Sequence, residues 1–131
     1  MDEEFYDIIE RIHEADPRYK PDAYLFIMEA LSYTQKRFSC VKHVTGNEML
    51  QGMKELLLHK FGPMTLTVLN HWGIRSTEDF GNLVFRLVDY HVLTKTDDDD
   101  IRNFRNGYSF EEVFERGNRK QLYKKISRMR G

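Results

Sequence analysis

The sequence predicts a single domain that is mainly α-helical. Apolar residues recur every three to four positions through most of the 131-residue chain, and helix-capping signals stand directly before several of these segments. Connections of about two to eight residues favour an irregular bundle of roughly five or six short helices over a long coiled coil. With 40% hydrophobic and 31% charged residues, the chain can bury one ordinary core but is too short for two domains.

Two helices are expected in the N-terminal third. The first covers about 3–15, where apolar residues follow the i, i+3, i+4, i+7 spacing of one helix face: Phe5, Ile8, Ile9 and Ile12. It ends before Asp16-Pro17, since a residue that precedes proline is pushed out of the helical region. Asp22 is the expected N-cap of the second helix, which runs to about Phe38 and is apolar on more than half its girth.

Three further helices are expected at about 45–61, 63–72 and 77–92. The run from Thr45 to Glu48 fits a capping box, and Gly62-Pro63 ends this helix and begins the next. Gly73 ends the short helix, and Ser76 gives a weaker cap for the third. That third helix has the clearest periodicity in the chain, carried by Phe80, Leu83, Val84, Leu87, Val88 and His91.

The pattern changes after the third of these helices. A small β-hairpin is expected near 92–109, with its turn either at the acidic tip 97–100 or at Asn106-Gly107, and Ser109 then begins a short helix. Three helices followed by a hairpin is also the order of a winged helix, so the bundle has a winged-helix-like alternative. In a winged helix the third helix and the hairpin tip contact DNA. Both carry acidic residues here, which repel phosphate and argue against sequence-specific recognition of duplex DNA.

Charge divides the chain into a helical core domain, 1–115, and a basic C-terminal tail, 116–131. The core holds 21 acidic and 13 basic residues, a formal charge of −8, whereas the tail holds seven basic residues and no acidic one. The acidic N-terminus does not fit a signal peptide, and no apolar run is long enough to cross a membrane. The one cysteine, Cys40, is typical of a reducing compartment, so a cytoplasmic location is expected.

Several short runs resemble those of a bacterial family of small proteins of unknown function. The runs are Ala23-Tyr24-Leu25-Phe26, Tyr33-Thr34-Gln35-Lys36-Arg37, His43-Val44-Thr45-Gly46, Phe61-Gly62-Pro63-Met64, His71-Trp72-Gly73-Ile74, Asp79-Phe80-Gly81 and the closing Asn103-Phe104, Tyr108, Phe110 and Val113-Phe114. The resemblance covers about 5–115, and it departs at Asn103, where an acidic residue is expected. It implies a bacterial, cytoplasmic, mainly helical protein and carries over no activity.

Two clusters could carry chemistry. His71 and Trp72 could form a stacking or acid–base site, although Trp72 as a core anchor and Gly73 as a C-cap explain the same run. Glu55 and His59, four residues apart on one helix, could share a metal, but further ligands with a recognised spacing are missing, and an exposed i, i+4 pair explains them better. The aspartates 97–100 lack the ligand spacing of a calcium-binding EF-hand loop.

The expected function is therefore a non-catalytic interaction module that binds a protein or RNA partner through the tail, with no cofactor. The tail residues expected to bind are Arg119, Lys120, Tyr123, Lys124, Lys125 and Arg128, joined by His71 and Trp72 in the core. Tyr123 could stack on an unpaired base. Alternatively, the tail packs on its own acidic core or stays frayed. The competing function is a small enzyme or a metal- or ligand-binding protein with its site around His71, Glu55 and His59.

Overall fold

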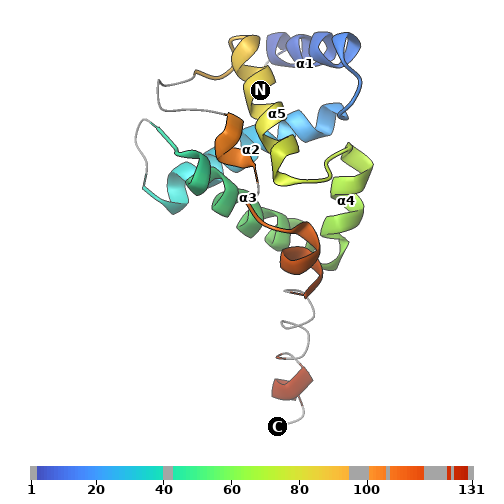
Figure 1. The fold of residues 1–131 in the computed structure, drawn as a ribbon, viewed down its shortest axis with the longest axis vertical. Coiled ribbons are helices and arrows are strands. Elements are labelled where there is room, and N and C mark those ends of the chain that lie inside the picture. Colours follow the sequence, from blue (N-terminus) through green and yellow to red (C-terminus); the bar gives the residue numbers. More distant parts are fainter. Residues whose placement is uncertain are drawn as a thin grey trace.

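The computed structural model describes residues 3–39, 43–94, 101–105, 107–116, 124 and 126–129. These residues form helices and no strand, so the prediction of a mainly α protein is confirmed. Five α-helices make up the body (Figure 1): α1 (Glu3–Ala15), α2 (Pro21–Arg37), α3 (Gly46–Phe61), α4 (Thr65–Trp72) and α5 (Thr77–Asp89). Short helical turns follow at η1 (Gly62–Met64), η2 (Ile101–Phe104) and η3 (Glu111–Arg116).

The helix boundaries follow the local capping signals. The predicted box before α3 is formed: the Thr45 hydroxyl accepts from the Glu48 amide at 3.1 Å, and the Glu48 carboxylate accepts from the Thr45 amide at 3.0 Å. Gly62 and Gly73 end α3 and α4 with positive φ angles of 48° and 86°. The expected N-cap at Asp22 is wrong, because α2 begins two residues after Tyr19 with Lys20 as its cap and proline in its first turn.

Helix α2 is the centre of the core, and it packs against both α3 and α5. Its inward face is fully buried along most of its length. The approach to α3 is close at Gly52: a Cβ atom there would lie 1.8 Å from the Thr34 hydroxyl. Thr34 itself donates its hydroxyl hydrogen to the Ala30 carbonyl at 2.7 Å. The two helices can therefore reach this separation only because position 52 carries no side chain.

The segment after α5 docks on the body through aromatic side chains. Phe104, Phe110 and Phe114 are buried, and the Tyr108 hydroxyl donates to the Leu50 carbonyl of α3 at 2.9 Å. Burial raises the pKa of Tyr108 above its usual value, so this donor stays protonated at neutral pH. The ring of Phe80 on α5 lies 5.4 Å from that of Phe110, centroid to centroid. Aromatic contacts thus join the C-terminal segment to both α3 and α5.

The β-hairpin expected near 92–109 is not formed by the described part of that segment. Residues 101–104 form the helical turn η2, and 107–109 have no regular structure, while 95–100 and 106 lie outside the described residues. Phe104 packs directly over Gly81 of α5, where a Cβ atom would lie 2.9 Å from the Phe104 Cβ. Side-chain packing of this kind replaces strand pairing here, so the described residues after α5 provide no wing.

Helix α5 is shorter than its apolar periodicity predicts. It ends at Asp89, and His91 adopts a left-handed conformation with φ at 62° instead of continuing the apolar face. The amide of Val92 then donates to the Leu87 carbonyl at 2.8 Å, which closes the helix end. The chain reverses at a histidine in a position where glycine is the usual residue.

The described part of the tail is helical and exposed. Apart from Arg116, which ends η3, it consists of Lys124 and residues 126–129, which Figure 1 places at the end of the molecule opposite α1. Ile126 is 41% exposed and Met129 is 85% exposed. Among the described helices, none is both long enough and apolar enough to cross a membrane.

Candidate functional site

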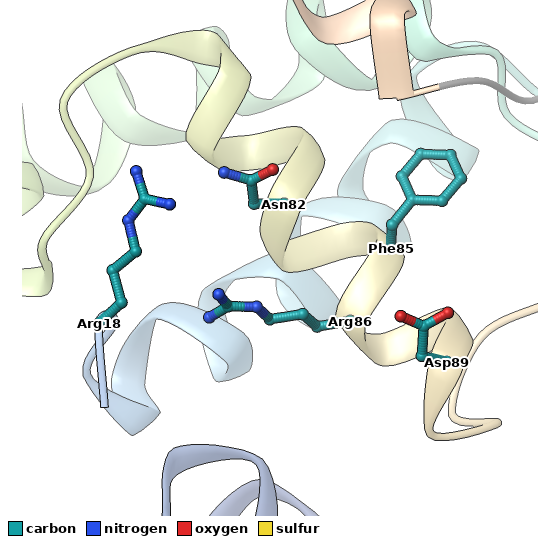
Figure 2. A pocket seen from close by; sticks show the side chains of 5 residues that line it. All are labelled: Arg18, Asn82, Phe85, Arg86 and Asp89. Carbon is teal, nitrogen blue, oxygen red and sulfur yellow. The ribbon is translucent and has the colours of Figure 1, made fainter. Parts of the chain in front are cut away.

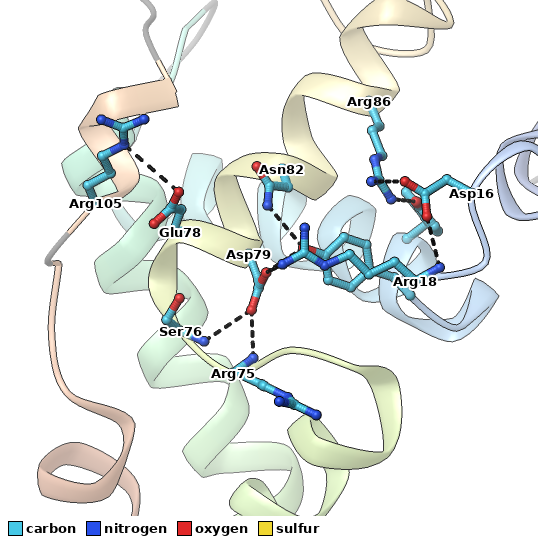
Figure 3. A network of polar contacts seen from close by, with 11 residues as sticks. Asp16, Arg18, Arg75, Ser76, Glu78, Asp79, Asn82, Arg86 and Arg105 are labelled. Atoms are coloured by element: carbon cyan, nitrogen blue, oxygen red, sulfur yellow. Dashed lines mark hydrogen bonds and ion pairs between the residues drawn. The ribbon is translucent and has the colours of Figure 1, made fainter.

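A buried carboxylate, Asp79, joins the start of α5 to the connector between α1 and α2. Its Oδ2 atom accepts from the backbone amides of Arg75 at 2.8 Å and Ser76 at 3.3 Å, which caps α5. Its Oδ1 atom accepts from the Tyr19 hydroxyl and from Nη2 of Arg18, the latter at 3.2 Å (Figure 3). Four donors thus satisfy one carboxylate whose side chain is 6% exposed.

Tyr19 is fully buried at the middle of this arrangement. Besides donating to Asp79, its hydroxyl accepts from the side-chain amide of Asn82 at 3.1 Å. The guanidinium carbons of Arg18 and Arg86 lie 5.2 and 5.0 Å from the centre of its ring. Burial, strengthened by the hydrogen bond to Asp79, raises the pKa of Tyr19 to about 12. Tyr19 is therefore protonated at neutral pH and acts as a fixed hydrogen-bond donor.

Arg86 extends the arrangement to α2 and to the end of α1. Its Nη1 atom donates to the Tyr24 hydroxyl at 3.2 Å, and its Nη2 atom forms an ion pair with Asp16. The side chain of Arg86 is 21% exposed, compared with 56% for Arg18. We call these residues the connector–α5 network: Asp16, Arg18, Tyr19, Tyr24, Asp79, Asn82 and Arg86.

A shallow hollow of about 250 Å³ opens beside this network. Arg18 lines it from the connector, and four residues line it from one face of α5 at i, i+3, i+4 and i+7: Asn82, Phe85, Arg86 and Asp89 (Figure 2). The two guanidinium groups lie toward one end, and Asp89 lies toward the other. Asp89 is exposed and has no ion-pair partner among the residues that the structure describes. The hollow thus offers positive charge at one end and a free carboxylate at the other.

His71 and Trp72 occupy different environments. Trp72 is buried, with ring centroids 5.5 Å from Phe26 on α2 and 5.7 Å from Phe61 on α3, and its carbonyl accepts from the Lys20 amide. His71 is exposed at the end of α4. Trp72 therefore contributes to the core at the junction of three helices, and only His71 of this pair faces solvent.

Glu55 lies in a second polar group, between α2 and α3, which we call the Glu55 cluster. Its carboxylate accepts from the Tyr33 hydroxyl at 3.0 Å, from Nε of Arg37 at 3.0 Å and from the Gln51 amide at 2.9 Å. Partial burial raises the pKa of Glu55, but these three hydrogen bonds outweigh it and leave the pKa below its usual value. His59 is exposed, and no group of three potential metal ligands occurs in the described part of the chain.

The tail residues singled out from the sequence are only partly described. Lys124 and Arg128 lie on helical residues and are exposed. Arg119, Lys120, Tyr123 and Lys125 lie outside the described residues.

Sequence reasoning missed the connector–α5 network. Its cross-links join residues 60 to 70 positions apart, and no local pattern pairs Arg18 with Asp79 or Asp16 with Arg86. The polar residues of α5 at 82, 86 and 89 are also what an ordinary solvated helix face carries, so the sequence offers no signal that distinguishes this network.

Comparison with protein-family models, curated proteins and solved structures finds no match to the chain. The resemblance to a bacterial family therefore stays a prediction, and function has to be argued from the residues and their geometry.

Proposed function

We propose that the protein is a non-catalytic interaction module whose basic tail, 116–131, binds an acidic groove on a partner protein. The observation that carries this proposal is the exposure of two large apolar side chains, Ile126 and Met129, on the same helical stretch as the exposed cations Lys124 and Arg128. A helix that presents apolar and cationic side chains together is suited to an apolar groove with an acidic rim.

A protein partner accounts for more of these side chains than RNA does. Phosphate contacts require only the cations, whereas Ile126 and Met129 gain about 25 cal/mol for each Å² of apolar surface that a groove removes from water. Methionine also adapts its shape to an irregular apolar surface. With Leu122, these residues follow the i, i+4, i+7 spacing of one helix face.

The acid–base groups of the core support a non-catalytic function. Tyr19 donates to Asp79 and Tyr33 donates to Glu55, and each of these pairs cross-links separate parts of the fold. Tyr19 is protonated well beyond neutral pH, and Asp79 has all its accepting directions occupied by donors. Neither is free to take a proton from a substrate at neutral pH.

The test compares two tail variants of the full-length protein. A charge variant changes Arg119, Lys120, Lys124, Lys125 and Arg128 to Gln, and an apolar variant changes Ile126 and Met129 to Ser. The matched control changes two exposed core cations, Arg11 and Lys36, to Gln. A protein partner cross-linked from native lysate should be lost with both tail variants and retained with the control and after nuclease treatment.

Other outcomes identify the competing models. Loss with the charge variant alone, together with nuclease sensitivity and an affinity that falls steeply with salt, would establish RNA as the partner and contradict the proposal. A melting temperature several degrees lower in the charge variant, without loss of any partner, would show instead that the tail stabilises its own core.

A further inference from the structure

We propose that the hollow beside α5 binds a linear zwitterion, in which a carboxylate and an ammonium group are separated by a short aliphatic chain. An ω-amino acid and the C-terminal lysine of a peptide both have this chemistry. The proposal does not rest on the tail, because every residue that lines the hollow belongs to the connector or to α5.

The arginine end suits a carboxylate. Arg18 donates to Asp79 through Nη2 alone, so its Nη1 and Nε donors have no protein partner among the described residues. A guanidinium binds both oxygens of a carboxylate through Nη2 paired with either Nε or Nη1, and because Asp79 takes only one hydrogen of Nη2, one of these two forks stays available. With a side chain 56% exposed, Arg18 can reach a ligand from solvent without breaking its bond to Asp79.

The arginines are held in position before any ligand arrives. Arg18 is fixed by Asp79 and Arg86 by Asp16, and both guanidinium groups stack near the ring of Tyr19. Ordering a free arginine side chain on binding has an entropic cost, and these contacts order both side chains in the unliganded protein. A polar network that is complete in the folded protein thus leaves preorganised donors on one side.

The other end suits an ammonium group. Asp89 is exposed and unpaired among the described residues, and it lies seven positions beyond Asn82, or about 10 Å along the helix axis. Phe85, partly buried, lies between these positions on the same wall of the hollow and offers an apolar surface to methylene groups. A chain of several carbons between the two ligand charges matches this spacing.

The local charge favours a zwitterion over a phosphate. Two arginines stand against three aspartates in and beside the hollow, Asp16, Asp79 and Asp89, which leaves a formal charge of −1. A phosphate dianion would add repulsion to this set, whereas a ligand with one charge of each sign adds none.

The first experiment is an NMR titration of the full-length protein with 6-aminohexanoate. We expect saturable shifts of the Asn82 side-chain amide, the Arg18 Nε–H and the Asp89 backbone amide, with a Kd on the order of 1 mM for so small a ligand. Acetate and n-butylammonium, each carrying one charge, should bind at least about tenfold more weakly. Inorganic phosphate binding more tightly than 6-aminohexanoate, or the absence of saturable shifts, would overturn the proposal.

Variants separate recognition from folding. Asp89→Asn leaves the connector–α5 network intact and should weaken 6-aminohexanoate about tenfold while leaving acetate binding and the melting temperature unchanged. Glu10→Gln, which removes an exposed carboxylate on α1, is the matched control and should change neither. Arg18→Gln should abolish binding of both probes, with folding monitored by circular dichroism. Equal affinity of the Asp89→Asn variant and the unaltered protein would show that the ammonium site does not exist.

A peptide arm distinguishes the two sources of this chemistry. Acetyl-Gly-Gly-Lys with a free C-terminus should bind like 6-aminohexanoate if the site reads a peptide end, and the amidated peptide should not bind. Binding of 6-aminohexanoate without binding of either peptide supports the same site for a free small molecule. Equal binding of the free and amidated peptides would contradict recognition of the carboxylate.

Discussion

Asp79 and Glu55 both cross-link separate parts of the chain, and both accept a hydrogen bond from a tyrosine. They differ in burial and in partners: Asp79 is 6% exposed and receives two backbone amides, whereas Glu55 is 23% exposed and receives side chains alone. Water can replace the side-chain partners of Glu55, whereas it cannot reach the fully buried Tyr19 that donates to Asp79. Asp79, which accepts from four donors including a fully buried hydroxyl, should therefore contribute more to stability than Glu55, which accepts from three side chains.

The largest effect is expected for Asp79→Ala. The substitution removes the cap of α5 and leaves the buried Tyr19 hydroxyl without its acceptor. The free energy of unfolding should fall by about 2 to 4 kcal/mol, the combined loss of a helix cap and of the acceptor of a buried donor. Urea unfolding followed by circular dichroism measures this. A loss below about 1 kcal/mol would show that the two carboxylates are equivalent.

The next effect tests whether close packing, rather than Glu55, holds α2 against α3. Gly52→Ala places a methyl group 1.8 Å from the Thr34 hydroxyl and should lower stability by about 1 to 3 kcal/mol, more than the roughly 1 kcal/mol that alanine gains in a helix. Thr34→Ala in the same chain should restore most of the loss. Thermal unfolding of the four proteins in this cycle gives the coupling energy. An additive double variant would contradict direct contact.

Unfolding at alkaline pH should distinguish the contribution of Tyr19 to stability from that of Tyr33. The pKa of Tyr19 is raised to about 12 in the folded protein, so above the ordinary value of 10 the unfolded state loses its proton first. The stability that Tyr19 contributes is therefore fully present below pH 10 and is lost as pH rises toward 12, by at most about 1.4 kcal/mol per pH unit. Tyr19→Phe should reduce the slope of the unfolding free energy against pH by the contribution of one proton. Tyr33→Phe should reduce this slope less. Urea unfolding between pH 9 and 11.5 tests both.

The smallest effect is expected for Glu55→Gln. The lowered pKa of Glu55 means that its contribution is present above the ordinary pKa of 4.5 and is lost as pH falls through the lower folded value. At pH 7 the variant should be less stable by at most about 1 kcal/mol, and near pH 3 the difference should shrink toward zero. A larger loss at pH 7 would place Glu55 in the same class as Asp79.

The sequence predicted those parts of the fold that depend on neighbours in the chain. The capping box at Thr45, the glycine ends at 62 and 73, and Ser109, whose hydroxyl accepts from the Glu112 amide, all act within a few residues. The predicted end of α5 is wrong. The apolar spacing continues to 91, but the helix stops where Tyr90 and His91 turn the chain.

The candidate site was beyond prediction for a different reason. Tyr19 lies in a short connector that reads as an exposed loop, yet it is fully buried because Asp79, sixty positions later, accepts its hydrogen bond. The sequence pattern marks the start of α5 through Ser76, and the burial of Asp79 follows only from the packing of α5 on the connector. Which charges meet across a fold is a tertiary property, and one sequence does not contain its pairings.

The position of Trp72 has a spectroscopic consequence. It is the one tryptophan in the chain, and its indole is enclosed by rings from α2 and α3 while its carbonyl is bonded to the connector. Its fluorescence emission therefore arises from the junction of three helices and should lie at short wavelength in the folded state. Any loosening of the helical body should therefore shift the emission to the red.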